Sequence, residues 1–253
     1  MTFFGKFDKP VFFHVVLWHG KDGHSIPGYD SRDPNVITNQ LKAMRMLAGD
    51  SFGVIALTFG HLMSPFIHQA VMAMCHQCNA QEVPFALCFD PWTVKNPDGS
   101  FPPVPERNKR MIAELQYADT QFILNAKCYL PGKLVFDFAT GCDKVAITAA
   151  VPDIQYLLNG PDFDWPRIPP QPNKTKVPCV YIQFNDGTGE DRNKSVHDQT
   201  KPVRMIPSLG GDTFWGRNVD SNEAEIIQFA TWNDYKEGTE LEPFASMLGG
   251  EIW

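Results

Sequence analysis

The acidic residues Asp234 and Glu237 lie three positions apart near the C-terminal end of the chain, shortly after the aromatic residue Trp232. If the chain turns helically after Trp232, both carboxyl groups lie on one face. Hydrolysis of a glycosidic bond uses two carboxyl groups, one to protonate the leaving oxygen and one to act as base or nucleophile. On spacing alone the pair is more typical of a charged, solvent-exposed turn, so its position in the fold must decide.

The residues that follow the predicted strands are mostly acidic or aromatic. Sugars present polar hydroxyl edges, which carboxylates and amides bind, and apolar C–H faces, which aromatic rings cover. The sequence has no glycine-rich phosphate loop and no cluster of arginines, which disfavours a phosphorylated substrate. The strand-end residues are Trp18 and His19, His61, Asp90 with Trp92, Asp137, Asn185 with Asp186, and Trp232 to Glu237.

Short apolar runs alternate with amphipathic stretches, and this alternation predicts successive strand–helix units. Two helices have clear start signals, because Asp33-Pro34 and Ser64-Pro65 each combine a capping side chain with a proline in the first turn. Few helical stretches occur in the second half, which predicts an irregular second half of the fold. The predicted strands are 11–18, 52–59, 84–89, 133–138, 154–158, 180–184, 203–206 and 226–232, and the predicted helices are 33–47, 64–79, 106–118 and 142–150, with a helix or turn at 222–228.

The length of 253 residues fits one (β/α)8 barrel, which takes about 250 residues, and no linker divides the chain. An open doubly wound sheet is the alternative for alternating units, but it normally carries a glycine-rich phosphate turn after its first strand. The segment from Trp18 to Gly23 has no such turn. We therefore predict an α/β fold with one domain over residues 1–253, a TIM-type barrel whose strands end at the active site.

The charge and hydropathy of the chain limit its partners. A formal net charge of −7 argues against nucleic acid, which requires a basic surface. No stretch approaches the roughly 20 apolar residues that span a membrane. Residues 1–10 lack the apolar core of a signal peptide. We expect a soluble protein without membrane contact, either cytoplasmic or released by lysis or within a particle.

Cysteine and histidine spacing gives little support for a metal or cofactor. Cys75 and Cys78 form a C-x-x-C pair on a predicted helix, but no second pair follows. We expect buried structural thiols and a reducing compartment. His14 and His19 are five positions apart, which does not match the H-x-H pattern of metal-dependent barrel hydrolases. The sequence therefore predicts no metal and no cofactor.

Three segments resemble glycoside hydrolase families. Residues 232–243, WNDYKEGTELEP, resemble the W/F-N-E-W-x-E-G-T-x-I-E-P signature of family 99 and the W-N-D-Y-G-E of the family 71 α-1,3-glucanases. Residues 26–34 resemble the G-Y-x-S-x-D-P stretch of family-99-like proteins, and residues 90–92 resemble their acidic-Pro-aromatic element. The segments occur in the same order as in those proteins and span nearly the whole chain.

The resemblance implies an endo-acting enzyme for α-linked glycans on a (β/α)8 barrel, with Asp234 as general base and Glu237 as general acid. Two positions depart from family 99. Asp234 stands where that family has Glu, which shortens the reach by roughly 1.5 Å, and Lys236 stands where His or a small residue is usual. The strand ends and the resemblance together predict these sugar contacts: Trp18, His19, Tyr29, Asp90, Trp92, Asp137, Asn185, Trp232 and Asn233.

Three functions fit these observations. The first is a glycosidase that acts on an α-mannan or α-glucan through the carboxylate pair. The second is a non-catalytic barrel that binds an oligosaccharide or polysaccharide or has a structural role, for example as a component of a phage particle. The third is a cytoplasmic protein of polysaccharide assembly. The sugar linkage and the stereochemistry of hydrolysis stay open at this point.

Overall fold

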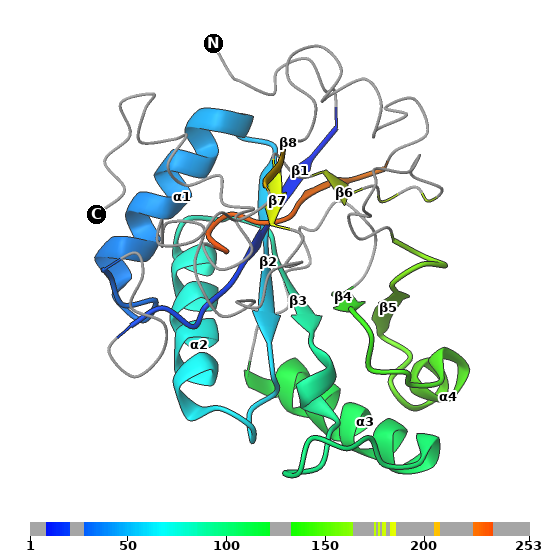
Figure 1. Ribbon diagram of the computed structural model, residues 1–253. Coiled ribbons are helices and arrows are strands. Elements are labelled where there is room, and N and C mark those ends of the chain that lie inside the picture. The colour runs from blue at the N-terminus through cyan, green and yellow to red at the C-terminus, as the bar shows by residue number, and fades with distance from the viewer. Residues whose placement is uncertain are drawn as a thin grey trace.

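The computed structural model describes residues 9–20, 28–121, 133–163, 175, 177, 179–180, 183–185, 205–207 and 225–234. Its main feature is a seven-stranded sheet in which every pair of neighbouring strands is parallel. The strand order is β5-β4-β3-β2-β1-β9-β6 (Figure 1). The strands are β1 Val11–Val15, β2 Phe52–Thr58, β3 Phe85–Phe89, β4 Lys133–Asp137, β5 Ile154–Leu158, β6 Cys179–Val180 and β9 Ile227–Phe229.

The first five strands lie side by side in chain order, and the last strand, β9, pairs with the first. Val11 of β1 is in register with Ile227 of β9, more than two hundred residues later in the chain. Such pairing between the first and last strands is what the closing of a barrel requires. The described strands therefore form a parallel α/β half-barrel, and the predicted alternation of strands and helices is confirmed over this part.

Four helices connect the first five strands. They are α1 Pro34–Ala48, α2 Pro65–Ala80, α3 Val104–Gln121 and α4 Lys144–Ala150, and they lie around the outside of the sheet (Figure 1). Two of the starts follow the predicted capping chemistry: the Asp33 side chain accepts a hydrogen bond from the backbone N–H of Asn35 at 2.8 Å, and that of Ser64 accepts one from Ile67 at 3.4 Å. Within the described ranges, no helix is long and apolar enough to cross a bilayer.

The second half differs from the sequence prediction in one respect. The predicted strand 180–184 is divided between β6 and the separate strand β7 Gln183–Asn185, and the predicted strand 203–206 corresponds to β8 Met205–Pro207. β7 and β8 pair with each other in an antiparallel ribbon outside the main sheet. The prediction that these runs continue the barrel as parallel strands is wrong for β7 and β8. Length is not the reason, because β9 is equally short and β6 is shorter, and both pair in parallel in the main sheet. An antiparallel ribbon needs no crossover connection and no place in a covered sheet, whereas a parallel strand needs both.

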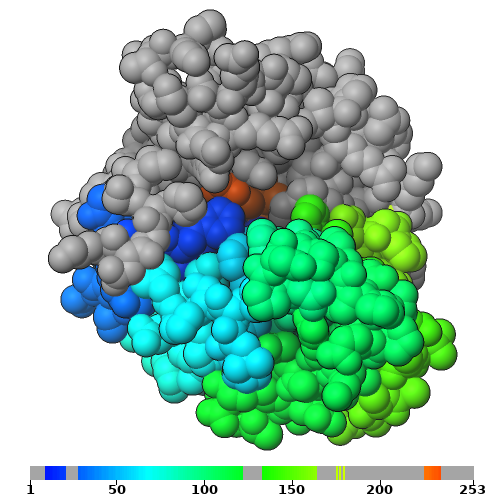
Figure 2. All heavy atoms as spheres, turned by 60° about the horizontal axis from the view of Figure 1, so that its bottom comes forward, coloured from blue at the N-terminus to red at the C-terminus, as the bar shows by residue number. Residues whose placement is uncertain are grey.

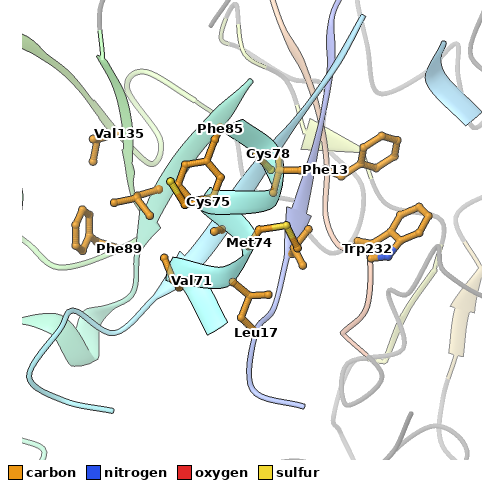
Figure 3. Close-up of a cluster of buried hydrophobic side chains, with 14 of the residues drawn as sticks. Phe13, Leu17, Val71, Met74, Cys75, Cys78, Phe85, Phe89, Val135 and Trp232 are labelled. Atoms are coloured by element: carbon orange, nitrogen blue, oxygen red, sulfur yellow. The ribbon is translucent and has the colours of Figure 1, made fainter. Parts of the chain in front are cut away.

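Alternating side chains of the strands form two separate hydrophobic cores. On β1, Phe13 and Val15 point outward into the layer between sheet and helices, whereas Phe12 belongs to an inner cluster with Ile55, Cys88 and other residues. The outer layer also holds Cys75 and Cys78 of α2, and burial raises the pKa of the Cys78 thiol well above its usual value. Both sides of the sheet are therefore covered. Figure 3 shows side chains of the outer layer: Phe13, Leu17, Val71, Met74, Cys75, Cys78, Phe85, Phe89, Val135 and Trp232.

Candidate active site

The inner face of the sheet opens into a hollow of about 100 Å³ at the carboxyl ends of the strands. On this end of the molecule, the segment that contains β9 (orange) is set back between β1 (blue) and the green elements (Figure 2). This is the end at which barrel enzymes carry their active sites. The described residues that line the hollow are His14, Val16, Trp18, Leu57, Asp90, Phe138, Thr231 and Asp234.

Asp234 reaches the hollow from the segment that follows β9. Only 5% of its surface is exposed, so its carboxyl group faces the interior of the fold. Its backbone N–H donates to Oγ1 of Thr231 at 2.9 Å. The N–H of Trp232, the residue after Thr231, donates to the carbonyl oxygen of His14 on β1 at 2.6 Å. These bonds hold the backbone of the predicted general base against the first strand.

Asn233 continues this attachment with its side chain. Oδ1 accepts from the backbone N–H of Val16 at 2.9 Å, and Nδ2 donates to the carbonyl oxygen of the same residue at 3.0 Å. The amide therefore satisfies both backbone groups of Val16, as a neighbouring strand would. Nδ2 also donates to the Tyr29 hydroxyl at 2.9 Å. Because Asn233 is fully buried and holds the backbone that directly follows β1, its geometry is that of a brace for Asp234.

His19 and Tyr29 complete the brace from the other side. The Nε2–H of His19 donates to the carbonyl oxygen of Asn233 at 2.8 Å. The Tyr29 ring lies edge-on to His19 with centroids 5.5 Å apart, and its hydroxyl accepts from Nε2 of Gln40 at 3.0 Å. Both residues are buried. They connect the segment after β1 and helix α1 to the backbone beside Asp234.

Asp90 brings a second carboxyl group to the hollow from the end of β3. Burial raises the pKa of Asp90, although the backbone N–H of Trp92, which donates to Oδ1 at 2.9 Å, and the positive charge of Lys95 act in the opposite direction. A carboxyl group with a raised pKa keeps its proton to higher pH. The hollow therefore combines two carboxyl groups from different strands, one of them biased toward its protonated form.

His14 forms an uncharged polar part of the lining. Burial lowers the pKa of His14 to about 4, although a hydrogen bond with Gln228 opposes this shift. Nε2 of Gln228 donates to the carbonyl oxygen of Val177 at 2.9 Å, so its Oε1 is the atom that faces His14. Nε2 of His14 must then carry a proton and donate to that oxygen at 2.7 Å. The imidazole is thus fixed as one neutral tautomer.

The predicted sugar contacts separate into distinct groups in the structure. Trp18 and Asp90 line the hollow, whereas His19, Tyr29 and Asn233 brace its wall. Trp92 is 41% exposed on the loop after β3. Asn185 lies in β7, and its side chain falls outside the described residues, as does all of Glu237.

Two further predicted contacts point away from the hollow. Trp232 is fully buried in the helix-facing core, edge-on to Phe13 with centroids 5.5 Å apart (Figure 3). Asp137 is buried at the end of β4, where its carboxylate accepts from the backbone N–H of Thr140 at 2.8 Å and from the Tyr156 hydroxyl. Asp137 therefore ties β4 to β5 and to the turn that follows β4.

The strand-end residue His61 also faces a helix. Its Nδ1 lies 2.8 Å from Oε2 of Glu114 on α3, and its ring is stacked on Tyr117 at a centroid distance of 4.0 Å. These contacts fix the loop after β2 to α3. They explain why a histidine at a strand end does not contribute to the lining of the hollow.

Five of the lining residues are not among the predicted sugar contacts. They are His14, Val16, Leu57, Phe138 and Thr231. The period of two along β1 would have placed His14 and Val16 on the same face as Trp18. Of the other three, Leu57 has neither polar nor aromatic character, and the Thr231 hydroxyl and the Phe138 ring do not by themselves mark a sugar contact.

Comparisons with known proteins support the fold. No family model and no curated protein sequence matches this chain. Among solved structures, the GH99 endo-α-mannosidase from Bacteroides thetaiotaomicron in complex with Bis-Tris propane superposes with a TM-score of 0.58 at 13% identity, covering 93% of this chain and 87% of that one. A second structure of the enzyme from that organism gives a TM-score of 0.54 at 12% identity, covering 93% and 88%. The chain therefore has a fold like that of GH99 endo-α-mannosidases.

Proposed function

We propose that this protein is a glycoside hydrolase that cleaves an α-linked glycan in the hollow at the carboxyl ends of its strands. The observation that carries the proposal is the convergence of Asp90, Asp234 and the Trp18 ring on one hollow. The similarity in fold to endo-α-mannosidases supports it and favours an α-mannan as the substrate. An α-glucan is the alternative, and it rests on the resemblance of residues 232–237 to family 71.

The reaction needs one group that donates a proton and one that accepts a proton. Glu237 is our candidate for the general acid, which protonates the glycosidic oxygen as the bond to the anomeric carbon breaks. Asp234 is the candidate base, which takes the proton from the attacking oxygen. Asp90, with its raised pKa, lines the same hollow as Asp234 and is our candidate for hydrogen bonds with sugar hydroxyls.

The remaining site residues divide into contacts and supports. Trp18 offers a ring for the apolar face of a sugar, and the neutral His14 adds a polar group without adding charge. Trp92 and Asn185 stay proposed sugar contacts. We assign His19, Tyr29 and Asn233 to positioning of Asp234, and Trp232 and Asp137 to packing and strand connection, because their bonds run to the protein itself.

We further infer that residues 1–253 form one domain whose sheet closes into an eight-stranded (β/α) barrel. The support is the pairing of β9 with β1, together with the four regular strand–helix units from β1 to β5. Neither metal nor cofactor is part of the proposed mechanism, since the carboxyl groups supply both proton transfers.

A glycan panel tests this function. It includes α-mannans and α-1,3-glucans, with detection of new reducing ends and NMR of the first anomer formed. Release of a defined anomer from one of these glycans is the expected result. Binding of an oligosaccharide without product release would instead identify a non-catalytic carbohydrate-binding barrel. Absence of both binding and hydrolysis across the panel would remove the carbohydrate function.

A further inference from the structure

A cluster of exposed aromatic rings lies on the loop between β3 and α3. Trp92 is 41% exposed and Phe101 is 47% exposed, although both are large hydrophobic side chains. Nζ of Lys95 lies over both rings, 4.5 Å from the centroid of Trp92 and 5.0 Å from that of Phe101. The Arg107 guanidinium lies 5.5 Å from the Phe101 centroid. We refer to Trp92, Lys95, Phe101 and Arg107 as the aromatic platform.

The backbone that carries the platform is held by many hydrogen bonds. Arg110 of α3 donates to the carbonyl oxygens of Val94 and Lys95 at 3.0 and 2.9 Å. Asn96 and Ser100 close the turn between the two rings, with Nδ2 of Asn96 donating to the Ser100 hydroxyl at 3.0 Å. A loop fixed in this way has little conformational entropy left to lose when a ligand binds.

Gly99 keeps the turn close to the indole ring. Its φ is +84°, a conformation that other residues rarely adopt. A Cβ at this position would lie 3.7 Å from the Trp92 ring, which is an ordinary van der Waals contact. The turn therefore packs beside the indole, and its backbone conformation is what requires the glycine.

The two cations of the platform lack carboxylate partners. Within the part of the chain that the structure describes, neither Lys95 nor Arg107 forms an ion pair, in contrast to Arg110, which pairs with Glu106. Arg107 donates to the carbonyl oxygen of Thr140 at 3.1 Å. Lys95 lies near enough to the partly buried Asp90 to lower its pKa but forms no ion pair with it. Cations held over aromatic faces without an ion-pair partner favour an anionic ligand, because the ligand then supplies that partner.

The platform is joined to the hollow through Asp90. The carboxyl group of Asp90 lines the hollow, and the same group caps the short helix η1 Pro91–Thr93 that carries Trp92. The exposed Trp92 lies two residues after Asp90, which lines the hollow. Asp90 therefore connects the hollow and the platform along the chain, so that one glycan could contact both.

We propose that Trp92, Lys95, Phe101 and Arg107 form an outer subsite for a sugar unit that carries an anionic group. The aromatic rings would cover its apolar C–H face, and the two cations would pair with its carboxylate or ester anion. The role of this subsite in hydrolysis rests on the proposed function, whereas its capacity to bind an acidic sugar does not.

Binding experiments on the full chain test the subsite directly. The probes are a trigalacturonate, a sulfated trisaccharide and a neutral trisaccharide. Their binding is measured by calorimetry and by the shift of the Trp92 indole N–H signal in NMR spectra. We expect the acidic probes to bind more tightly than the neutral one, with the preference falling as salt rises. The difference between the carboxylated and sulfated probes identifies which anion the site prefers.

Variants separate this site from the catalytic hollow. Lys95→Met keeps the alkyl stem and removes the charge, and should weaken binding of the preferred acidic probe about fivefold. Lys109→Met, at an exposed position of α3, is the matched control and should leave that affinity unchanged. Trp92→Ala should weaken binding of the acidic probe more than Lys95→Met does.

Equal binding of all three probes, or equal affinities of Lys95→Met and the wild type, would overturn the acidic subsite. Neither result depends on turnover. A protein that binds acidic sugars at the platform without hydrolysing any glycan would refute the glycosidase proposal alone, and hydrolysis without acidic preference would refute the subsite alone.

Discussion

Replacement of Asn233 by Asp tests how strongly the brace holds the candidate base. In the native fold, Nδ2 donates to the carbonyl oxygen of Val16 at 3.0 Å and to the Tyr29 hydroxyl at 2.9 Å. In the Asn233→Asp variant at neutral pH, an acceptor replaces this donor. The carbonyl oxygen of Val16 then loses its partner and faces a buried carboxylate, while Oδ1 still accepts from the N–H of Val16.

The cost can be worked from these contacts. An unsatisfied buried acceptor costs about 1–3 kcal/mol, and a lost hydrogen bond costs about 1 kcal/mol. Burial of a carboxylate adds to both, so we expect the free energy of unfolding at pH 7 to fall by about 3–5 kcal/mol. That is a large part of the roughly 5–15 kcal/mol by which domains are stable.

The pH dependence gives a second readout with a defined sign. Burial beside a carbonyl oxygen raises the folded-state pKa of the new Asp above its unfolded value of about 3.9. The protonated group can again donate to the Val16 carbonyl. Its stabilisation is therefore present below the unfolded pKa and is lost as pH rises through the raised folded pKa. The variant should approach wild-type stability near pH 4.

Urea denaturation followed by circular dichroism between pH 4 and pH 8 measures both effects. Asn35→Asp is the matched control, because Asn35 is exposed in the first turn of α1 and should change stability by less than about 0.5 kcal/mol. A loss below about 1 kcal/mol at pH 7 for Asn233→Asp, or a loss that does not shrink at low pH, would refute the bracing role.

Three further predictions follow from the same structure. The raised pKa of Asp90 stabilises the wild-type fold at low pH, and this stabilisation is lost as pH rises. The stability of Asp90→Asn minus that of the wild type should therefore be greater at pH 7 than at pH 4, and denaturant midpoints at both pH values measure it. His14, with a folded-state pKa of about 4, should remain neutral and protonated at Nε2 between pH 5 and 8 in nitrogen-15 spectra, and its contribution to stability should be lost as pH falls from about 6.5 toward 4; a charged ring at pH 6 would contradict the lining described here. Trp232→Ala should cost about 3–5 kcal/mol of stability, because the indole fills the helix-facing core; a loss below about 1 kcal/mol in urea denaturation would contradict this placement.

Local patterns in the sequence predict much of the first half of the fold. The capping pairs Asp33-Pro34 and Ser64-Pro65 fix the starts of α1 and α2 because their chemistry depends on neighbouring residues only. The apolar runs of β1 to β5 are buried on two faces and therefore stand out as strands. The shorter runs that form β7 and β8 lack this signal, and their pairing with each other depends on contacts between distant residues.

The candidate site shows where sequence reasoning stops. Position in the chain places Trp232, Asn233 and Asp234 together after β9, yet Trp232 enters the outer core, Asn233 binds the backbone that directly follows β1, and Asp234 reaches the hollow. These directions depend on the backbone of a non-helical segment that pairs with β1. The direction of Asp137 could have been predicted. It lies two residues after Val135, which points outward, and side chains two apart in a strand point to the same face, here toward the helices.

The rate of reducing-end release by Asp234→Asn, relative to the wild type, tests the central claim most directly. The assay uses the best substrate of the glycan panel, with Asp153→Asn at an exposed position as the control for removal of a negative charge. We predict a loss of about 10²–10⁴-fold for Asp234→Asn with an unchanged circular dichroism spectrum, and wild-type rates for Asp153→Asn. Full activity of Asp234→Asn on that substrate would contradict the assignment of the hollow as the catalytic site.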